Sequence, residues 1–194
     1  MADWLAESRT GAAADRILDA ADELFAQHDA ASVGMNEVAK AAGCSRATLY
    51  RYFENRDSLY TAYVHREAHR VFRELGEQVT AAGEPGAQLV EGIIASLRQV
   101  RESPALSSWF APTQRPIGGE MAERSEVIKA RTEAYLAALG VQDVERRARW
   151  LLRVMVSLLV FPGHDEAEER AMLEEFVLPA LMTELAPRLG DAAR

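Results

Sequence analysis

The chain has little cysteine, no long apolar run and no excess of basic residues, and each shortage excludes a class of protein. Its 194 residues include a single cysteine, Cys44, which excludes an intrachain disulfide and suits a reducing compartment. The longest apolar stretch, Trp150–Phe161, is interrupted by Arg153 and Ser157 and falls short of the ~18–20 residues that span a bilayer. Residues 1–10 are polar and acidic, so we expect no secretory signal. These shortages predict a cytoplasmic protein with no membrane partner.

The net charge of −8 is not typical of a general nucleic-acid binder. Residues 1–60 carry 6 basic against 10 acidic side chains. Residues 44–56 reverse that balance, because Arg46, Arg51 and Arg56 face only one acid, Glu54. We therefore expect modest non-specific affinity for DNA and specific binding that weakens steeply with salt.

Residues 34–53 are the most informative stretch and predict two short helices joined by a tight turn. Gly43 can adopt the left-handed conformation that ends a helix, and Ser45 can cap the next one. Leu49 and Phe53, four residues apart, share the inward face of that second helix. The side chains left facing out or along the rim are Arg46, Ala47, Thr48, Tyr50, Arg51 and Tyr52. This is the layout of a helix-turn-helix, whose second helix enters the major groove of DNA.

The chemistry of these outward side chains suits DNA. Arg46 and Thr48 can hydrogen-bond to base edges, and Ala47 can contact a thymine methyl. Tyr50, Tyr52, Arg51 and Arg56 have the reach and the donors for phosphate oxygens. Any one of these residues alone would more simply be a core tyrosine or a solvated arginine. Together with the turn, and with Ser45 added, they predict a DNA-binding set.

Residues 16–59 resemble the DNA-binding domain of the TetR family of transcriptional regulators. The matching motifs are Arg16-Ile17-Leu18-Asp19-Ala20-Ala21, Leu24-Phe25, Glu37-Val38-Ala39, Ala42-Gly43-Cys44-Ser45, Thr48-Leu49-Tyr50-Arg51-Tyr52-Phe53, Asn55-Arg56-Asp57 and Leu59. The resemblance implies an all-helical homodimer, with three N-terminal helices that bind operator DNA and a larger C-terminal domain that binds a small effector. It places the DNA-binding domain at residues 1–56, with residues 1–10 flexible, and the effector-binding and dimerisation domain at residues 57–194.

Three positions depart from the family pattern. Asp29 stands where a glycine usually follows the first helix, and Asp is less tolerant of the left-handed conformation. Gly34 stands where a threonine usually begins the second helix; glycine can serve as an N-cap, but the threonine's hydroxyl contact to phosphate is lost. Cys44 replaces a common valine, and we expect it to pack as a small hydrophobe.

Helical periodicity continues along the rest of the chain, so we expect an all-α fold. A long fourth helix begins near Arg56, and Ser103-Pro104 predicts a capped restart after the fifth helix. Pro112–Gly119 is predicted to be a loop. Further helices are expected near 120–139, 143–161 and 165–186, with Asp165 and Glu168 forming a capping box and Pro179 kinking the last helix.

The last two predicted helices indicate a two-fold interface. The stretch Trp150–Phe161 is apolar nearly all round, which predicts deep burial, and the last helix has a broad apolar face. A monomeric core that covers both is the simpler but less economical alternative. The predicted interface residues are Leu152, Val156, Phe176, Val177 and Leu181.

An effector pocket is expected between the fifth and eighth helices, although large apolar side chains at helical spacing are more often core. Arg153 in an apolar helix requires either an anionic ligand or an intramolecular partner such as Glu91, because an unpaired buried charge is costly. The pocket should take an apolar or amphipathic small molecule. Its predicted lining is Trp109, Phe110, Met121, Tyr135, Trp150, Arg153 and Met155.

We expect neither an enzyme nor a cofactor. His65 and His69 have a spacing that can hold a metal, but Glu67 does not complete an H-E-x-x-H motif and no third ligand is nearby, so no metal site is predicted. Cys44 lies far in sequence from any histidine that could activate it.

The sequence therefore predicts a ligand-responsive regulator, most simply a repressor released from a palindromic operator by an effector. Two alternatives stay open: a partner-dependent regulator with a degenerate DNA-binding head, and a small-molecule binding protein without a role on DNA.

Overall fold

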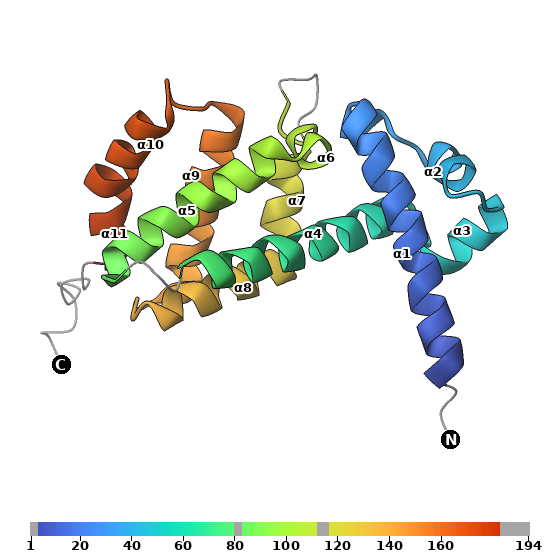
Figure 1. Ribbon diagram of the computed structural model, residues 1–194, viewed down its shortest axis with the longest axis horizontal. Helices are drawn as coiled ribbons and strands as arrows, with labels where there is room; N and C mark the ends of the chain where they lie inside the picture. The colour runs from blue at the N-terminus through green and yellow to red at the C-terminus, as the bar shows by residue number, and fades with distance from the viewer. Residues whose placement is uncertain (1–3, 80–82, 112–116, 183–194) are drawn as a thin grey trace, which may run out of the picture.

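The computed structural model describes residues 4–79, 83–111 and 117–182, and within these ranges the chain is helical with no strand. The N-terminal part contains α1 (Trp4–Gln27), a 3₁₀ turn (Ala30–Ser32), α2 (Met35–Ala41) and α3 (Arg46–Tyr52). We call this part the head (Figure 1). Because α1 begins at Trp4, part of the segment expected to be flexible is helical.

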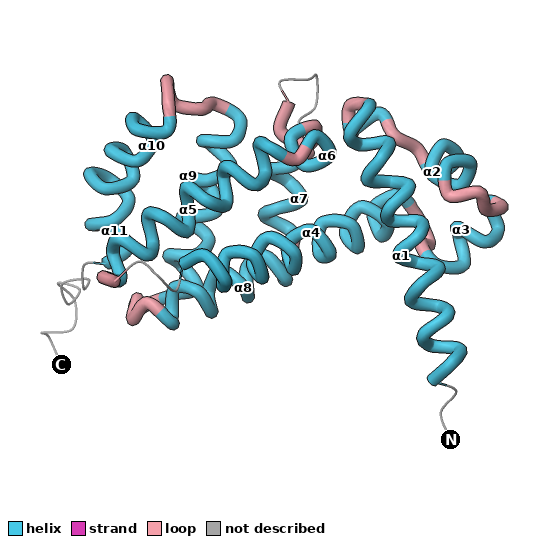
Figure 2. Tube along the Cα trace, viewed as in Figure 1, coloured by secondary structure: helices cyan, strands magenta, loops and turns pink. Residues whose placement is uncertain are grey.

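The remaining helices form the body. They are α4 (Arg56–Val79), α5 (Pro85–Glu102), α6 (Pro104–Ser107), α7 (Gly118–Arg124), α8 (Glu126–Ala138), α9 (Val144–Val160), α10 (Glu166–Met172) and α11 (Leu178–Met182), with a π-helical turn at Leu173–Val177 between the last two. Figure 2 shows that short loops join most of these helices. No helix in the described residues is both long and apolar enough to cross a membrane.

Helix α4 joins the two parts as one rod of 24 residues (Figure 1). Its first turns pack in the head, where Leu59, Tyr60 and Tyr63 are buried. Its later turns bury Val71 and Leu75 against the body. A continuous helix is stiff over this length, so a tilt at one end is transmitted to the other.

The apolar core of the head extends into the body. Buried side chains of α1, α2, α3 and α4 form one apolar cluster that also contains Ala105, Leu106 and Trp109 from the region of α6. A second cluster joins α5, α8 and α9 to the C-terminal helices. Short helix α6 thus packs against α1 as well as α5.

Local signals placed several helix ends correctly. Ser103 accepts a hydrogen bond from the Leu106 amide (3.2 Å) and caps α6 as predicted. Asp165 likewise accepts from the Glu168 amide (2.8 Å). The reciprocal half of the predicted capping box is wrong, because the Glu168 carboxylate accepts from the amide of His164 instead of that of Asp165.

Other boundaries differ from the predictions. The helix expected at 120–139 is two helices, because Ser125 ends α7 and accepts a hydrogen bond from the Ile128 amide to begin α8. The predicted loop Pro112–Gly119 ends sooner, since Gly118 already belongs to α7; residues 112–116 lie outside the described residues. The last helix is described to Met182 only, and a π turn precedes Pro179.

Candidate functional site

The turn between α2 and α3 is built as the sequence predicts. Gly43 has a φ of +63°, and the amide of Cys44 donates to the carbonyl of Ala39 across it (3.0 Å). The hydroxyl of Ser45 accepts from the amide of Thr48 (3.1 Å) and caps α3. These contacts fix the angle at which α3 leaves the head.

Helix α3 is divided into a buried and an exposed face. Leu49 and, just past the helix, Phe53 are buried in the core of the head. Arg46, Ala47, Tyr50 and Arg51 are exposed, and Thr48 and Tyr52 are half-buried. The Ser45 and Thr48 hydroxyls lie 2.9 Å apart, and the Arg51 guanidinium lies 5.2 Å from the centre of the Tyr52 ring. The helix thus presents a continuous polar and cationic strip to solvent.

Arg56 is placed differently from the other predicted DNA-binding residues. Its guanidinium donates to the Ala31 carbonyl and to the Tyr60 hydroxyl (2.8 Å), and that hydroxyl lies 2.8 Å from the Val33 carbonyl. Burial raises the pKa of Tyr60, so it stays a neutral hydrogen-bonding group. Arg56 therefore ties α4 to the link before α2, a contact with residues about 25 positions away that the local pattern did not indicate.

The three departures from the family pattern have local explanations. Asp29 does not adopt the left-handed conformation anticipated there; its φ is −55° and its carboxylate caps the 3₁₀ turn by accepting from the Ala31 amide (3.0 Å). Gly34 is the N-cap of α2, and its own amide donates to the Glu37 carboxylate (2.7 Å). Cys44 is half-buried against the apolar cluster of the head, as expected of a small hydrophobe.

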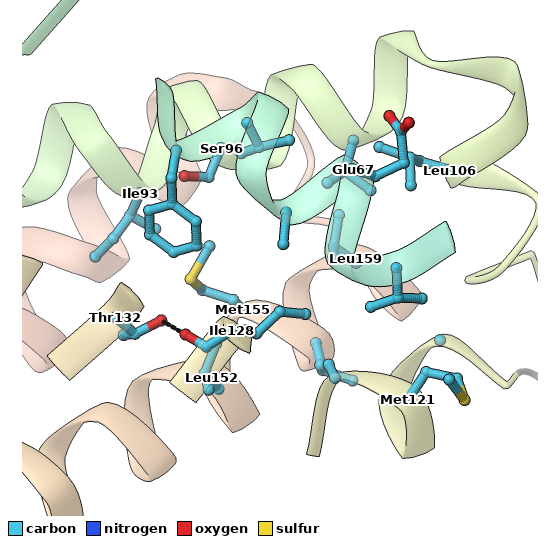
Figure 3. A pocket seen from close by; sticks show the side chains of 18 of the residues that line it. Glu67, Ile93, Ser96, Leu106, Met121, Ile128, Thr132, Leu152, Met155 and Leu159 are labelled. Atoms are coloured by element: carbon cyan, nitrogen blue, oxygen red, sulfur yellow. Dashed lines mark hydrogen bonds between the residues drawn. The ribbon is translucent and has the colours of Figure 1, made fainter. Parts of the chain in front are cut away.

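A cavity of about 160 Å³ lies in the body between α4, α5, α7, α8 and α9 (Figure 3). Five of the seven predicted pocket residues line it: Trp109, Phe110, Met121, Tyr135 and Met155. The apolar side chains that α4 contributes were not among the predicted pocket residues. Periodicity places such residues on an inward face without distinguishing a filled core from a hollow one. The apolar α4 residues in the lining are Val64, Ala68, Val71, Phe72 and Leu75.

Two of the predicted pocket residues, Trp150 and Arg153, do not line this cavity. Trp150 is 40% exposed and lines no part of the cavity. Arg153 lies on the outside of α9, where it pairs with Glu123 (3.1 Å). Glu91, the alternative partner, pairs with Arg170 instead. The prediction that α9 is buried nearly all round is wrong, because the helix buries mainly one face.

Most polar groups of the cavity wall are already hydrogen-bonded. Ser96 and Thr132 donate to carbonyls of their own helices, and Figure 3 shows the Thr132 bond. The Tyr135 hydroxyl donates to the Gln88 carbonyl (2.7 Å), and burial raises its pKa to about 12. Glu67 accepts from Arg70 (2.8 Å). The buried Nε1 of Trp109 has no acceptor among the described residues.

Trp109 connects the cavity wall to the core of the head. Its ring stacks on Tyr63 with a centroid distance of 5.5 Å and meets the edge of Phe25 at 5.1 Å. Phe25 belongs to α1 and Tyr63 to α4. One buried aromatic side chain therefore contacts the cavity, helix α1 of the head and the first turns of α4. No local pattern in the sequence indicates this arrangement.

The five predicted interface residues lie on different faces. Val177 and Leu181 point into the body and are buried there, so they are not available to a second subunit in this conformation. Leu152 and Val156 are half-buried and line the cavity. Phe176 is 61% exposed. Other large exposed apolar side chains of the body, which the prediction omitted, are Trp150, Phe161 and Met172.

Among the described residues, no group of three potential metal ligands lies together, at His65 and His69 or elsewhere. His69 lies 2.9 Å from the guanidinium of Arg131. Burial, with His69 nearby, lowers the pKa of His65.

Comparison with known proteins agrees with this arrangement. The sequence model of the family described as "Bacterial regulatory proteins, tetR family" matches residues 17–63, from α1 into α4. An uncharacterized HTH-type transcriptional regulator of Mycobacterium tuberculosis, Rv1255c, is 60% identical over 180 residues, covering 91% of this chain and 89% of the relative.

Solved structures share the fold at lower identity. RolR in complex with resorcinol has a TM-score of 0.71 at 17% identity, covering 92% of this chain and 91% of RolR. The repressor FadR of Thermus thermophilus, in complex with lauroyl-CoA, has a TM-score of 0.62 at 23% identity, covering 91% of this chain and 99% of FadR.

Proposed function

Because this chain belongs to the TetR family of bacterial transcriptional regulators, we propose that it is a ligand-responsive repressor that leaves a palindromic operator when a small effector binds. The observation that supports this best is α4, which packs in the head at one end and lines the cavity at the other. Its site of action would be the cytoplasm, where its operator is accessible.

On DNA, α3 would enter the major groove with its exposed face toward the bases. Arg46, Ala47 and Thr48, in its first turn, would contact base edges, since this end of a recognition helix reaches deepest. Ser45, Tyr50, Arg51 and Tyr52 would contact phosphates and fix the register. Arg56 would act indirectly, by holding the head together through Ala31 and Tyr60.

A homodimer would supply the second head. Four large apolar side chains of this region are exposed: Trp150 on α9, Phe161 just after it, Met172 at the end of α10 and Phe176 in the π turn. Pairing these side chains about a two-fold axis would bury them in both subunits at once. The two α3 helices would then read half-sites about 34–36 Å apart.

The effector would act through its different affinity for two conformations of the body. A ligand in the cavity would touch both α4 and Trp109, and the Trp109 ring packs against Tyr63 of α4 and Phe25 of α1. A shift of these side chains would tilt α4 and change the distance between the heads. RolR and FadR were each crystallised with a small organic ligand, which supports an effector-binding role for the related body here.

The first test is selection of a randomised duplex library by the purified protein at near-physiological salt. We expect enrichment of one palindromic site. Arg46→Ala should weaken specific binding by about 5- to 150-fold, the value of one bidentate base contact, with little effect on non-specific binding. Arg146→Ala, which removes one exposed arginine of the body, is the matched control and should bind normally.

The alternatives predict other results. A folded dimer that enriches no sequence, with or without ligands, would favour a partner-dependent regulator or a binding protein with no role on DNA. Arg56→Ala tests the difference between an arginine that stabilises the head and one that contacts DNA. It should lower the melting temperature of the protein, whereas Arg46→Ala should not.

A further inference from the structure

A second hollow, of about 380 Å³, lies on the outer side of α7, α8 and α9. Three cationic side chains line it: Lys129 from α8, and Arg149 and Arg153 from α9. Glu123 is the only acidic residue in the lining. The hollow is therefore cationic, on a protein whose net charge is −8.

The acidic partners of these cations lie mostly outside the hollow and are well exposed. Lys129 pairs with Glu126, which is 83% exposed, and Arg149 pairs with Glu145, which is 76% exposed. Ion pairs between such exposed groups contribute little net free energy. An anion that enters the hollow can therefore replace these partners at small cost and gain charge-assisted hydrogen bonds.

The cationic hollow adjoins the apolar cavity. Ala122, Leu152 and Val156 line both, so the two spaces lie on either side of the same three side chains. The cavity side of this wall is apolar, and the outer side is bordered by the three cations. A rotation of Leu152 or Val156 would join the two spaces.

The opposite side of the cavity does not favour an anion. Figure 3 shows Glu67 on one side of the cavity, across from Leu152 and Met121. Glu67 is the only charged residue in the cavity lining, and its carboxylate is already bonded to Arg70. A ligand with an apolar part and an anionic group has one favourable orientation, with the anion toward α8 and α9.

We propose that the effector is an anionic amphiphile, with its apolar part in the cavity and its anionic group in the hollow beside Lys129, Arg149 and Arg153. This inference rests on the proposed effector role of the cavity. An apolar cavity of about 150 Å³ holds a benzene ring, so the volume here suits about six to eight apolar carbons.

The test measures calorimetric binding of octanoate, octyl phosphate and 1-octanol to the full-length protein. We expect both anions to bind at least about 10-fold more tightly than the alcohol, the effect of charge-assisted hydrogen bonds. Butanoate should bind more weakly than octanoate because it fills less of the cavity. The preference for octanoate over 1-octanol should decrease as salt is raised.

The double variant Arg149→Ala/Arg153→Ala should bind octanoate and 1-octanol alike, with binding of the alcohol unchanged. Arg146→Ala is the control. Arg146 lies on the same helix but lines neither the cavity nor the hollow, so this variant should still bind octanoate more tightly than 1-octanol. Binding of 1-octanol as tight as that of octanoate, an unchanged preference in the double variant, or no binding of any of these compounds would overturn the inference.

Operator release distinguishes this inference from the proposed function. If octanoate binds with the expected preference but does not release the selected operator, the ligand class stands and the proposed mechanism of release fails. If the operator is selected but none of the amphiphiles binds, the repressor assignment stands and the ligand class is wrong.

Discussion

Replacing Glu169 with glutamine should destabilise the body by removing a buried ion pair. The Glu169 side chain is 2% exposed and accepts two hydrogen bonds from Arg101, at 2.8 and 2.6 Å. It also accepts from the Gly163 amide (2.9 Å). This carboxylate joins α10 to α5 and to the loop after α9, and glutamine cannot neutralise Arg101.

The expected size of the loss follows from the exposure of the two partners. Breaking a fully buried pair costs about 3–5 kcal/mol. The Arg101 side chain is 34% exposed, so it can regain water when its partner is lost. We therefore expect about 2–3 kcal/mol, which for a chain of this length lowers the melting temperature by about 4–12 °C.

The assay is thermal denaturation followed by circular dichroism, at one protein concentration because dimers are stabilised by mass action. Glu166→Gln is the matched control. Glu166 pairs with Arg98 at 2.7 Å on the same two helices, but the side chains are 47% and 52% exposed. An exposed pair contributes about 0–1 kcal/mol, so this variant should melt close to the parent protein.

Acid should remove the difference between Glu169→Gln and the parent. Arg101 holds the pKa of the Glu169 carboxyl below its usual 4.5. A group whose pKa is lowered on folding stabilises the protein above its unfolded pKa, and this contribution is lost as the pH falls through the folded value. Equal melting of the two glutamine variants, or a stability gap that does not change between neutral and acid pH, would refute the reasoning.

Two further changes test the head and the cavity wall. Gly43→Ala should lower the free energy of unfolding by about 1–2 kcal/mol. The cause is the φ of +63° alone, because nothing lies within 4 Å of the added carbon. Gly43→Asn should lower it less, because asparagine tolerates that conformation, and denaturant titration measures both variants. Burial raises the pKa of Tyr135 to about 12. Its contribution to the free energy of unfolding should therefore be complete below pH 10 and be lost as the pH rises toward 12. Tyr135→Phe should remove this part of the alkaline loss of stability, measured as the melting temperature against pH.

Local chemistry made much of the head predictable from the sequence. The conformation of Gly43, the cap at Ser45 and the burial of Leu49 each depend on residues within a few positions. The all-helical fold followed in the same way, because the spacing of apolar residues reports which face of a helix is buried.

Contacts between distant segments are what the sequence did not predict. Arg56 reaches Ala31, and Arg153 reaches Glu123 on another helix, and no local spacing encodes such partners. Val177 and Leu181 were assigned to an interface because an apolar face does not say which neighbour covers it. The helix predicted near 120–139 contains Ser125, whose hydroxyl accepts a hydrogen bond from the Ile128 amide and begins a new helix.

The apolar cluster that passes from α1 through Tyr63 to Trp109 has a consequence for building chimaeras. Since α6 completes the core of the head, a fragment that ends within α4 would expose Phe25 and Tyr63 to water. A head transplanted onto another body would need matching side chains where Ala105, Leu106 and Trp109 now pack. Single substitutions along α3, the proposed recognition helix, leave this shared core intact, whereas an exchange of whole domains would not.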